Sequence, residues 1–264
     1  MNNSDDIQRR YGAPRFHPVL VTEVTRMRRG YYCVAGWDIQ NRRMVRPLQA
    51  SGENWQLAGG SRFPFNVGSL LDCSPVQQRR AEYPHATEDM LLARSPSSLE
   101  EWDEGTVYKF IHPTTVRSIR ELFGRPLNDD KFVADGTVCP SLGGVRTRRE
   151  HTAFIQDGFG KLRFRLNDSD GVHYDLPVTS EWLLRLFSCG ERGSEGLFGV
   201  DEANEWLCVT DPGTEIVLRI GLARGWSGVE GDWNPRRCYA QLNGVICPED
   251  NYHIFAGPPA PPHG

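Results

Sequence analysis

The stretch Tyr31–Leu48 (YYCVAGWDIQNRRMVRPL) most restricts the folds open to this chain, because it has the pattern of a β-hairpin. Its first half is aromatic, β-branched or small, which suits a half-buried pleated strand. Asp38 and Asn41 then supply turn chemistry, since short polar side chains hydrogen-bond their own backbone. The second half sets Met44 and Val45 among arginines. Such a hairpin suits the face of a small barrel that binds a polyanion, and it suits an ordinary amphipathic sheet equally well.

Other strands are expected along the chain, because 27 Gly and 18 Pro in 264 residues favour many short elements over long helices. The clearest alternation places Leu162, Phe164 and Leu166 on one face and charged residues on the other. The other predicted strands are 18–24, 69–76, 172–178, 215–224 and 236–247. We expect Arg219 to point outward from the strand 215–224. In 236–247 the predicted outward residues are Arg237, Tyr239, Gln241 and Asn243.

Short helices are predicted mainly in the middle of the chain. Segments 87–94 and 96–103 have helix-start chemistry, with Ser98 three residues before Glu101 as in a capping box. The helical spacing of 114–123 ends at Gly124 and Pro126. Two further helices are expected, one over 181–187 with Thr179 or Ser180 as its N-cap and one over 201–206.

The basic charge is gathered near the start of the chain. The net charge is −4, yet residues 1–50 hold nine Arg against four Asp or Glu, a local balance of +5. Residues 81–136 hold six Lys or Arg against eleven Asp or Glu, a balance of −5. Of the 30 basic residues, 27 are Arg, which binds phosphate bidentately and stacks on rings. A GC-rich genome explains the same bias without any function.

The sequence leads us to expect that several features are absent from this protein. The polar start lacks a secretory signal and no apolar run approaches about 18 residues, so we expect a cytoplasmic protein without membrane segments. The seven scattered cysteines predict reduced, mostly buried thiols and no zinc site. No nucleophile, phosphate-loop or metalloprotease motif is present, so we expect neither a cofactor nor enzymatic activity.

Two short signatures resemble a known family. Cys33, Ala35 and Gly36 followed by Arg46 and Pro47 match the Cys-x-Ala-Gly strand and Arg-Pro pair of the dual OB-containing domain family. A second signature lies in LRIGLARGW (218–226) and CYAQLNGVI (238–246). The resemblance covers roughly residues 16–248. It implies tandem OB folds and an accessory role beside effector enzymes in bacterial (antiviral) defence.

The predicted fold is therefore mainly β with a few short helices (α+β), as two OB-like five-stranded barrels joined by a helical connector. We expect the first barrel over 15–95, the connector over 96–140, the second barrel over 141–250 and a proline-rich tail over 251–264. Trp55, Phe63 and Phe65 lie in a loop of the first barrel. They either pack on the core, which is favoured, or serve as stacking platforms for bases.

Candidate binding residues are the arginines and rings expected on the outer faces of the two barrels, because guanidinium groups pair with phosphates and rings stack on bases. These residues are Tyr31, Trp37, Arg42, Arg43, Arg46, Arg163, Arg165, Arg219, Arg224, Arg237 and Tyr239. A polar face filled with arginine is also what any one-sided sheet displays. No catalytic or metal-binding residue is predicted.

The predicted function is non-catalytic binding of nucleic acid, as single-stranded DNA or RNA, by an accessory protein. The alternative is a protein–protein adaptor whose barrels and acidic connector dock a partner effector enzyme. OB faces serve both purposes, and the net acidity mildly favours the adaptor.

Overall fold

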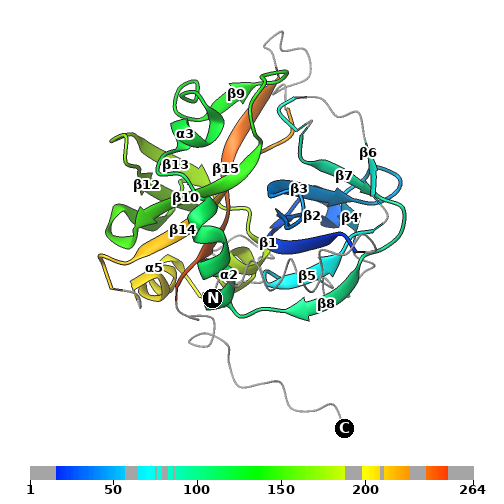
Figure 1. The fold of residues 1–264 in the computed structure, drawn as a ribbon. Helices are drawn as coiled ribbons and strands as arrows, with labels where there is room; N and C mark the ends of the chain where they lie inside the picture. Colours follow the sequence, from blue (N-terminus) through cyan, green and yellow to red (C-terminus); the bar gives the residue numbers. More distant parts are fainter. Residues whose placement is uncertain are drawn as a thin grey trace.

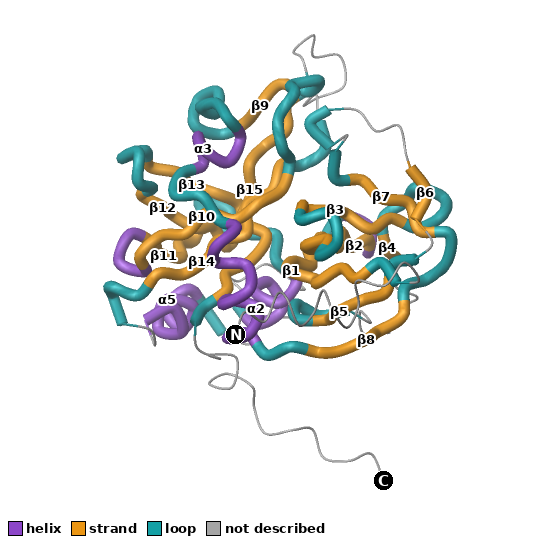
Figure 2. Tube along the Cα trace, viewed as in Figure 1, coloured by secondary structure: helices purple, strands orange, loops and turns teal. Residues whose placement is uncertain are grey.

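The computed structural model describes residues 16–56, 65–74, 76–78, 83–85, 87–187, 198–208, 211–225 and 236–248. Two β units lie side by side, the first on the right of Figure 1 and the second on the left. Among the described residues strands are more numerous than helices; Figure 2 colours the strands orange and the helices purple. The mainly β fold with short helices and two OB-like units is therefore confirmed. The predicted tail and Phe63 lie outside the described residues.

The first unit is an eight-stranded sheet in the order β6-β7-β3-β2-β1-β5-β8, with β4 paired to β2. The predicted hairpin is present as β2 and β3, joined by a turn in which the Asp38 carboxylate accepts from the backbone N–H of Gln40 at 3.1 Å and of Asn41 at 3.0 Å. The strands are β1 (Pro18–Arg26), β2 (Tyr31–Asp38), β3 (Arg43–Leu48), β4 (Trp55–Gln56), β5 (Ser69–Asp72), β6 (Val76–Gln78), β7 (Asp89–Leu92) and β8 (Ser97–Glu101).

The second unit combines a four-stranded sheet, in the order β10-β14-β15-β9, with a three-stranded sheet, β11-β12-β13. The predicted alternation is confirmed in β12, where Leu162, Phe164 and Leu166 are buried. The strands are β9 (Phe132–Ala134), β10 (Leu142–Arg148), β11 (Thr152–Gln156), β12 (Leu162–Asn167), β13 (His173–Pro177), β14 (Glu215–Leu222) and β15 (Arg237–Ile246).

Four α-helices and three 3-10 turns complete the described part of the chain. They are α2 (Glu104–Ile111), α3 (Ile119–Phe123), α4 (Glu181–Leu186), α5 (Val200–Cys208), η1 (Arg28–Gly30), η2 (His112–Thr114) and η3 (Arg149–His151). Ser180 caps α4, as predicted, by accepting from Leu183 N. Gly124 ends α3 in the left-handed conformation, with φ of 67°.

Two helix predictions are wrong. The segments 87–94 and 96–103 contain strands β7 and β8. β7 pairs in parallel with β3, and β8 pairs with β5. The hydroxyl of Ser98 does contact the Glu101 carboxylate at 3.4 Å, but it does so along an edge strand. Local capping chemistry is therefore overridden here by pairing with a distant strand.

Three apolar clusters form the interior. One fills the first unit around Val21, and another fills the second around Phe164 and Trp206. The third joins the units, because it brings Leu20 of β1 and Ile111 of α2 against strands β14 and β15. We call the boundary between the two units the seam. Trp55 and Phe65 pack edge to face with ring centroids 5.6 Å apart, as favoured from the sequence.

Gly36 is required where β2 pairs with β1. A Cβ atom at this position would overlap the carbonyl oxygen of Leu20 and would lie 2.9 Å from the Val19 side chain. The clash involves backbone, so it cannot be relieved by a rotamer change.

We expect Gly36→Ala to lower the free energy of unfolding by about 1–3 kcal/mol, the usual cost of overpacking a core. Urea denaturation measures this loss. Gly158→Ala is the matched control, because no atom lies within 4 Å of the position that its Cβ would take; its effect should stay within about 0.5 kcal/mol. Equal stability of the two variants would contradict the packing argument.

Candidate nucleic-acid interface

Charged side chains are buried in the seam in complementary sets. Glu23 of β1 is 1% exposed and accepts from Arg219 of β14 at 3.2 Å and from Asn243 of β15 at 2.5 Å. Removing a carboxylate from water is costly unless it is paired and hydrogen-bonded. The second unit therefore supplies the partners that make Glu23 tolerable in an apolar strand.

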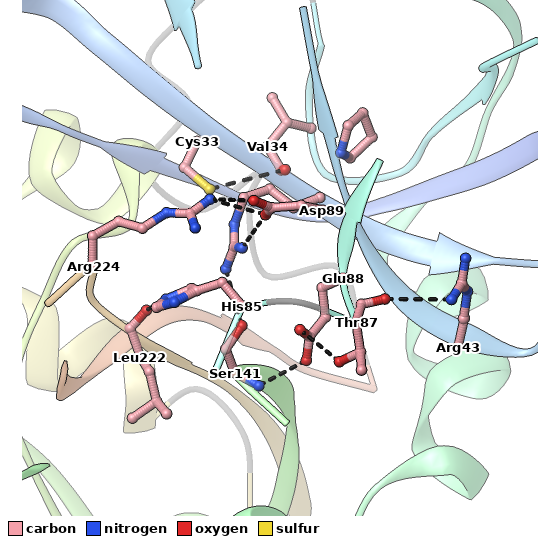
Figure 3. A network of polar contacts seen from close by, with 12 residues as sticks. Cys33, Val34, Arg43, His85, Thr87, Glu88, Asp89, Ser141, Leu222 and Arg224 are labelled. Carbon is pink, nitrogen blue, oxygen red and sulfur yellow. Dashed lines mark hydrogen bonds and ion pairs between the residues drawn. The ribbon is translucent and has the colours of Figure 1, made fainter. Parts of the chain in front are cut away.

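A second set surrounds Asp89 of β7 (Figure 3). Its carboxylate accepts from Arg46 of β3 at 2.7 Å, and both of its oxygens accept from Nη2 of Arg224, at 2.7 and 2.9 Å. The neighbouring Glu88 carboxylate accepts from the backbone N–H of Ser141 at 2.7 Å. Since Arg224 and Ser141 belong to the second unit, this network also crosses the seam.

The network controls two ionisation equilibria. Burial by itself would raise the pKa of Asp89, but the charges of Arg46 and Arg224 outweigh burial and hold the pKa below its usual value. Burial lowers the pKa of His85 to about 3, and the same two guanidinium groups add to the effect. His85 is therefore neutral, and its Nε2–H donates to the carbonyl oxygen of Leu222 at 3.0 Å.

Four of the predicted binding arginines are paired with carboxylates. Arg46 and Arg219 are 3% and 1% exposed. The predicted outward orientation of Arg219 is therefore wrong, because the side chain crosses the seam to Glu23. The same holds for Asn243, which is 4% exposed. Arg224 contacts Asp89 at 2.7 Å, and Arg163 contacts Asp175 across neighbouring strands at 2.5 Å.

Three predicted residues gather with Arg219 around one pocket beside the seam, which we call the junction pocket. Trp37 of β2 and Arg42 and Arg43 of the hairpin form one wall. Asp38 fixes this turn through its hydrogen bonds to Gln40 and Asn41, and Arg42 lies beyond it in the left-handed region with φ of 52°. The pocket has a volume of about 290 Å³. Its other lining residues are Met44, Thr87, Glu88, Thr114, Val116, Leu122, Pro140, Leu142, Gly143 and Gly144.

At this pocket the guanidinium groups of Arg42 and Arg43 are accessible to a ligand. Both side chains are exposed, and neither forms an ion pair with a carboxylate of the described ranges. Arg43 donates only to the backbone carbonyl of Thr87, at 3.3 Å. Arginines without acidic partners beside an aromatic ring are what a phosphate and its base require.

The remaining predicted residues occupy other surfaces. Arg237 and Tyr239 lie half-buried on β15 beside Phe132 of β9, with the guanidinium 4.6 Å from the Phe132 ring centroid and the two rings 5.5 Å apart. Tyr31 is half-buried at the β2–β4 pairing. Arg165 is exposed on β12 and lines a separate pocket with His151 and His173.

Sequence reasoning missed Phe132 and the buried acids of the seam. Phe132 gave no signal, since β9 is three residues long and pairs with a strand about a hundred residues away. Glu23 did give a signal: an acid within the apolar strand PVLVTEV needs a buried partner.

Within the described ranges, no cluster of three or more His, Cys, Asp or Glu residues is arranged to hold a metal ion. The helices of that part of the chain are all too short and polar to cross a membrane. Four of the five described free cysteines are buried, and Cys33 is half-buried.

The buried neutral His85 predicts an acid-sensitive fold. Between about pH 6.5 and pH 3 the unfolded chain takes up a proton at this histidine that the folded protein does not, so stability falls as the pH falls. The slope should approach about 1.4 kcal/mol per pH unit. His85→Gln keeps a donor for Leu222 and removes the titration. Urea denaturation from about pH 7 to pH 4.5 should show a shallower slope in the variant; parallel curves would refute the assignment.

One comparison with known proteins identifies the chain, and it agrees with the two signatures. A family model described as the dual OB-containing domain matches residues 19–245, from β1 to β15. No curated protein matches the chain. Because the match covers both β units and the seam between them, the chain belongs to the dual OB-containing domain family.

Proposed function

We propose that this protein binds single-stranded nucleic acid at the seam between its two barrels and does not transform it. The observation that carries the proposal is the pair Arg42 and Arg43, which are exposed beside the half-buried Trp37 and have no acidic partner among the residues that the structure describes. OB-fold domains commonly bind oligonucleotides across one barrel face and its loops. Family membership therefore favours the same use of this surface.

A single strand fits these features better than a duplex. Unstacked bases can lie on aromatic rings, and each such contact is worth about 1–3 kcal/mol. Trp37 and the Phe132–Tyr239 pair offer rings next to arginines at separate points along the two units. The net charge of −4 restricts attraction to these local patches and disfavours a general coating of DNA.

The family resemblance supports a finer role as part of this proposal. We place the protein in the bacterial cytoplasm as an accessory subunit beside an effector enzyme, in defence against foreign nucleic acid.

A protein–protein adaptor is the second candidate, and the net charge of −4 mildly favours it. Two large apolar side chains are open to contact by a partner: Phe159, in the turn between β11 and β12, is 85% exposed, and Val138 is 70% exposed. An adaptor would bind its partner equally well after nuclease treatment, whereas the nucleic-acid proposal requires binding to purified strands.

Fluorescence anisotropy with labelled single-stranded DNA and RNA tests the proposal. We expect binding at about 50 mM salt that weakens steeply by about 200 mM, since phosphate contacts release counterions. Arg42→Ala/Arg43→Ala should lower affinity about tenfold and reduce the logarithmic salt slope by up to about 1.4. The absence of any binding at low salt overturns the proposal and leaves the adaptor.

The matched control is Arg148→Ala/Arg185→Ala. It removes the same charge from two exposed arginines that do not line the junction pocket. If both double variants lose affinity equally, the strand is attracted by overall charge and the seam is not the site.

A further inference from the structure

The junction pocket contains a buried donor that the protein itself leaves unused. The Nε atom of Arg219 is shielded from solvent and has no hydrogen-bond partner in the described part of the chain. Its side chain is 2% exposed and lines the pocket from the β14 side. Buried donors are almost always satisfied, so an exception requires an explanation such as an absent ligand.

The guanidinium of Arg219 is held in a fixed position. Nη2 contacts the Glu23 carboxylate at 3.2 Å and the Met44 sulfur at 3.0 Å. Gly144 leaves the space for it, because a Cβ there would lie 2.7 Å from Nη1. Arg219 is therefore a fixed part of the pocket wall, and a rigid wall lowers the ordering cost of binding a ligand.

We propose that the junction pocket holds one nucleotide of the bound strand, and this rests on the proposed function. The base lies against Trp37, its phosphate contacts Arg42 and Arg43 at the rim, and Arg219 forms the wall on the β14 side. The strand would thus be fixed at this point by insertion of a single unit, while its neighbours follow the surface.

Size and lining support one nucleotide over other occupants. A volume of about 290 Å³ lies at the lower end of the range of about 300–1,000 Å³ for small-molecule sites, which leaves room for a single unit. Met44, Val116 and Leu122 supply apolar walls of the kind that a base contacts. A base inside a duplex is stacked and paired, so it would have to leave the helix to enter.

The carboxylate of Glu88, which lines the pocket, would repel a bound nucleotide only weakly. Glu88 is 4% exposed, and its two oxygens already accept from Ser141 N at 2.7 Å and from the Thr87 hydroxyl at 2.9 Å. Arg42 and Arg43 stand at the exposed rim, so the entrance is cationic. A negatively charged ligand with an aromatic part matches this distribution.

The test uses the full chain and free nucleoside 5′-monophosphates (AMP, GMP, CMP and UMP) in titration calorimetry at low salt, with adenosine and inorganic phosphate as separate ligands. We expect at least one monophosphate to bind more tightly than adenosine or phosphate. Thr114→Trp places a ring at the exposed rim and should weaken this binding at least tenfold. Ser97→Trp on the exposed strand β8 is the control and should leave it unchanged.

A second variant examines the pocket wall on the β14 side. Arg219→Lys retains a cation for Glu23 and removes the planar guanidinium that lines the pocket, so it should weaken nucleotide binding at least threefold. If Arg219→Lys unfolds the protein, Thr114→Trp alone decides the outcome. Inorganic phosphate binding as tightly as every monophosphate overturns the nucleotide assignment in favour of a plain anion site.

The two proposals fail in different ways. If strands bind but monophosphates do not, and if the Thr114→Trp variant binds strands as tightly as the natural protein does, the nucleotide pocket is overturned. The proposed function then stands. If monophosphates bind but strands do not, the proposed function and its use of the pocket are both overturned, because the ligand is then a free nucleotide. Failure of both ligands to bind at low salt overturns both.

Discussion

The structure depends on two carboxylates buried where the barrels meet. Glu23 and Asp89 belong to the first unit, and each takes a guanidinium from the second, Arg219 and Arg224. A buried carboxylate left without its partner is strongly destabilising, by about 3–5 kcal/mol in comparable cases. Neither unit can therefore expose its half of the seam without hydrating and rearranging these groups, and the apolar contacts of Leu20 and Ile111 add to the penalty.

This constraint also limits what the arginines can do. The chain contains 27 of them, yet Arg46 and Arg219 are buried in ion pairs at the seam and are out of reach of a phosphate. The exposed arginines of the junction pocket, Arg42 and Arg43, lie where a rigid turn places them. Asp38 holds the hairpin turn through backbone N–H groups, and the two arginines that follow it reach the pocket beside Trp37. A structural arginine and the two arginines proposed to bind the strand thus occur in the same hairpin: Arg46 closes the seam, and Arg42 and Arg43 are the proposed contacts.

Much of the fold was predictable because it is local. The hairpin, its Asp38 turn, the alternation in β12 and the Ser180 cap all follow from side chains a few residues apart. The orientation of Arg219 was not, because IVLRIGL is apolar on both faces and the assumption of one solvated face fails there. β7 and β8 were mistaken for helices, since pairing with the distant strands β3 and β5 leaves no local trace in segments of four and five residues.

The candidate site was predictable only in its residue types. Sequence selected Trp37, Arg42 and Arg43, but their meeting with Arg219 depends on how the second unit docks. That dependence has a consequence for binding. The walls of the junction pocket come from β2, β3, β10 and β14, so its shape exists only in the docked arrangement. A ligand in the pocket would bind this arrangement and not the separated units, and by linkage it would stabilise the seam. The buried charges then serve recognition indirectly, because they fix the one geometry in which the pocket is formed.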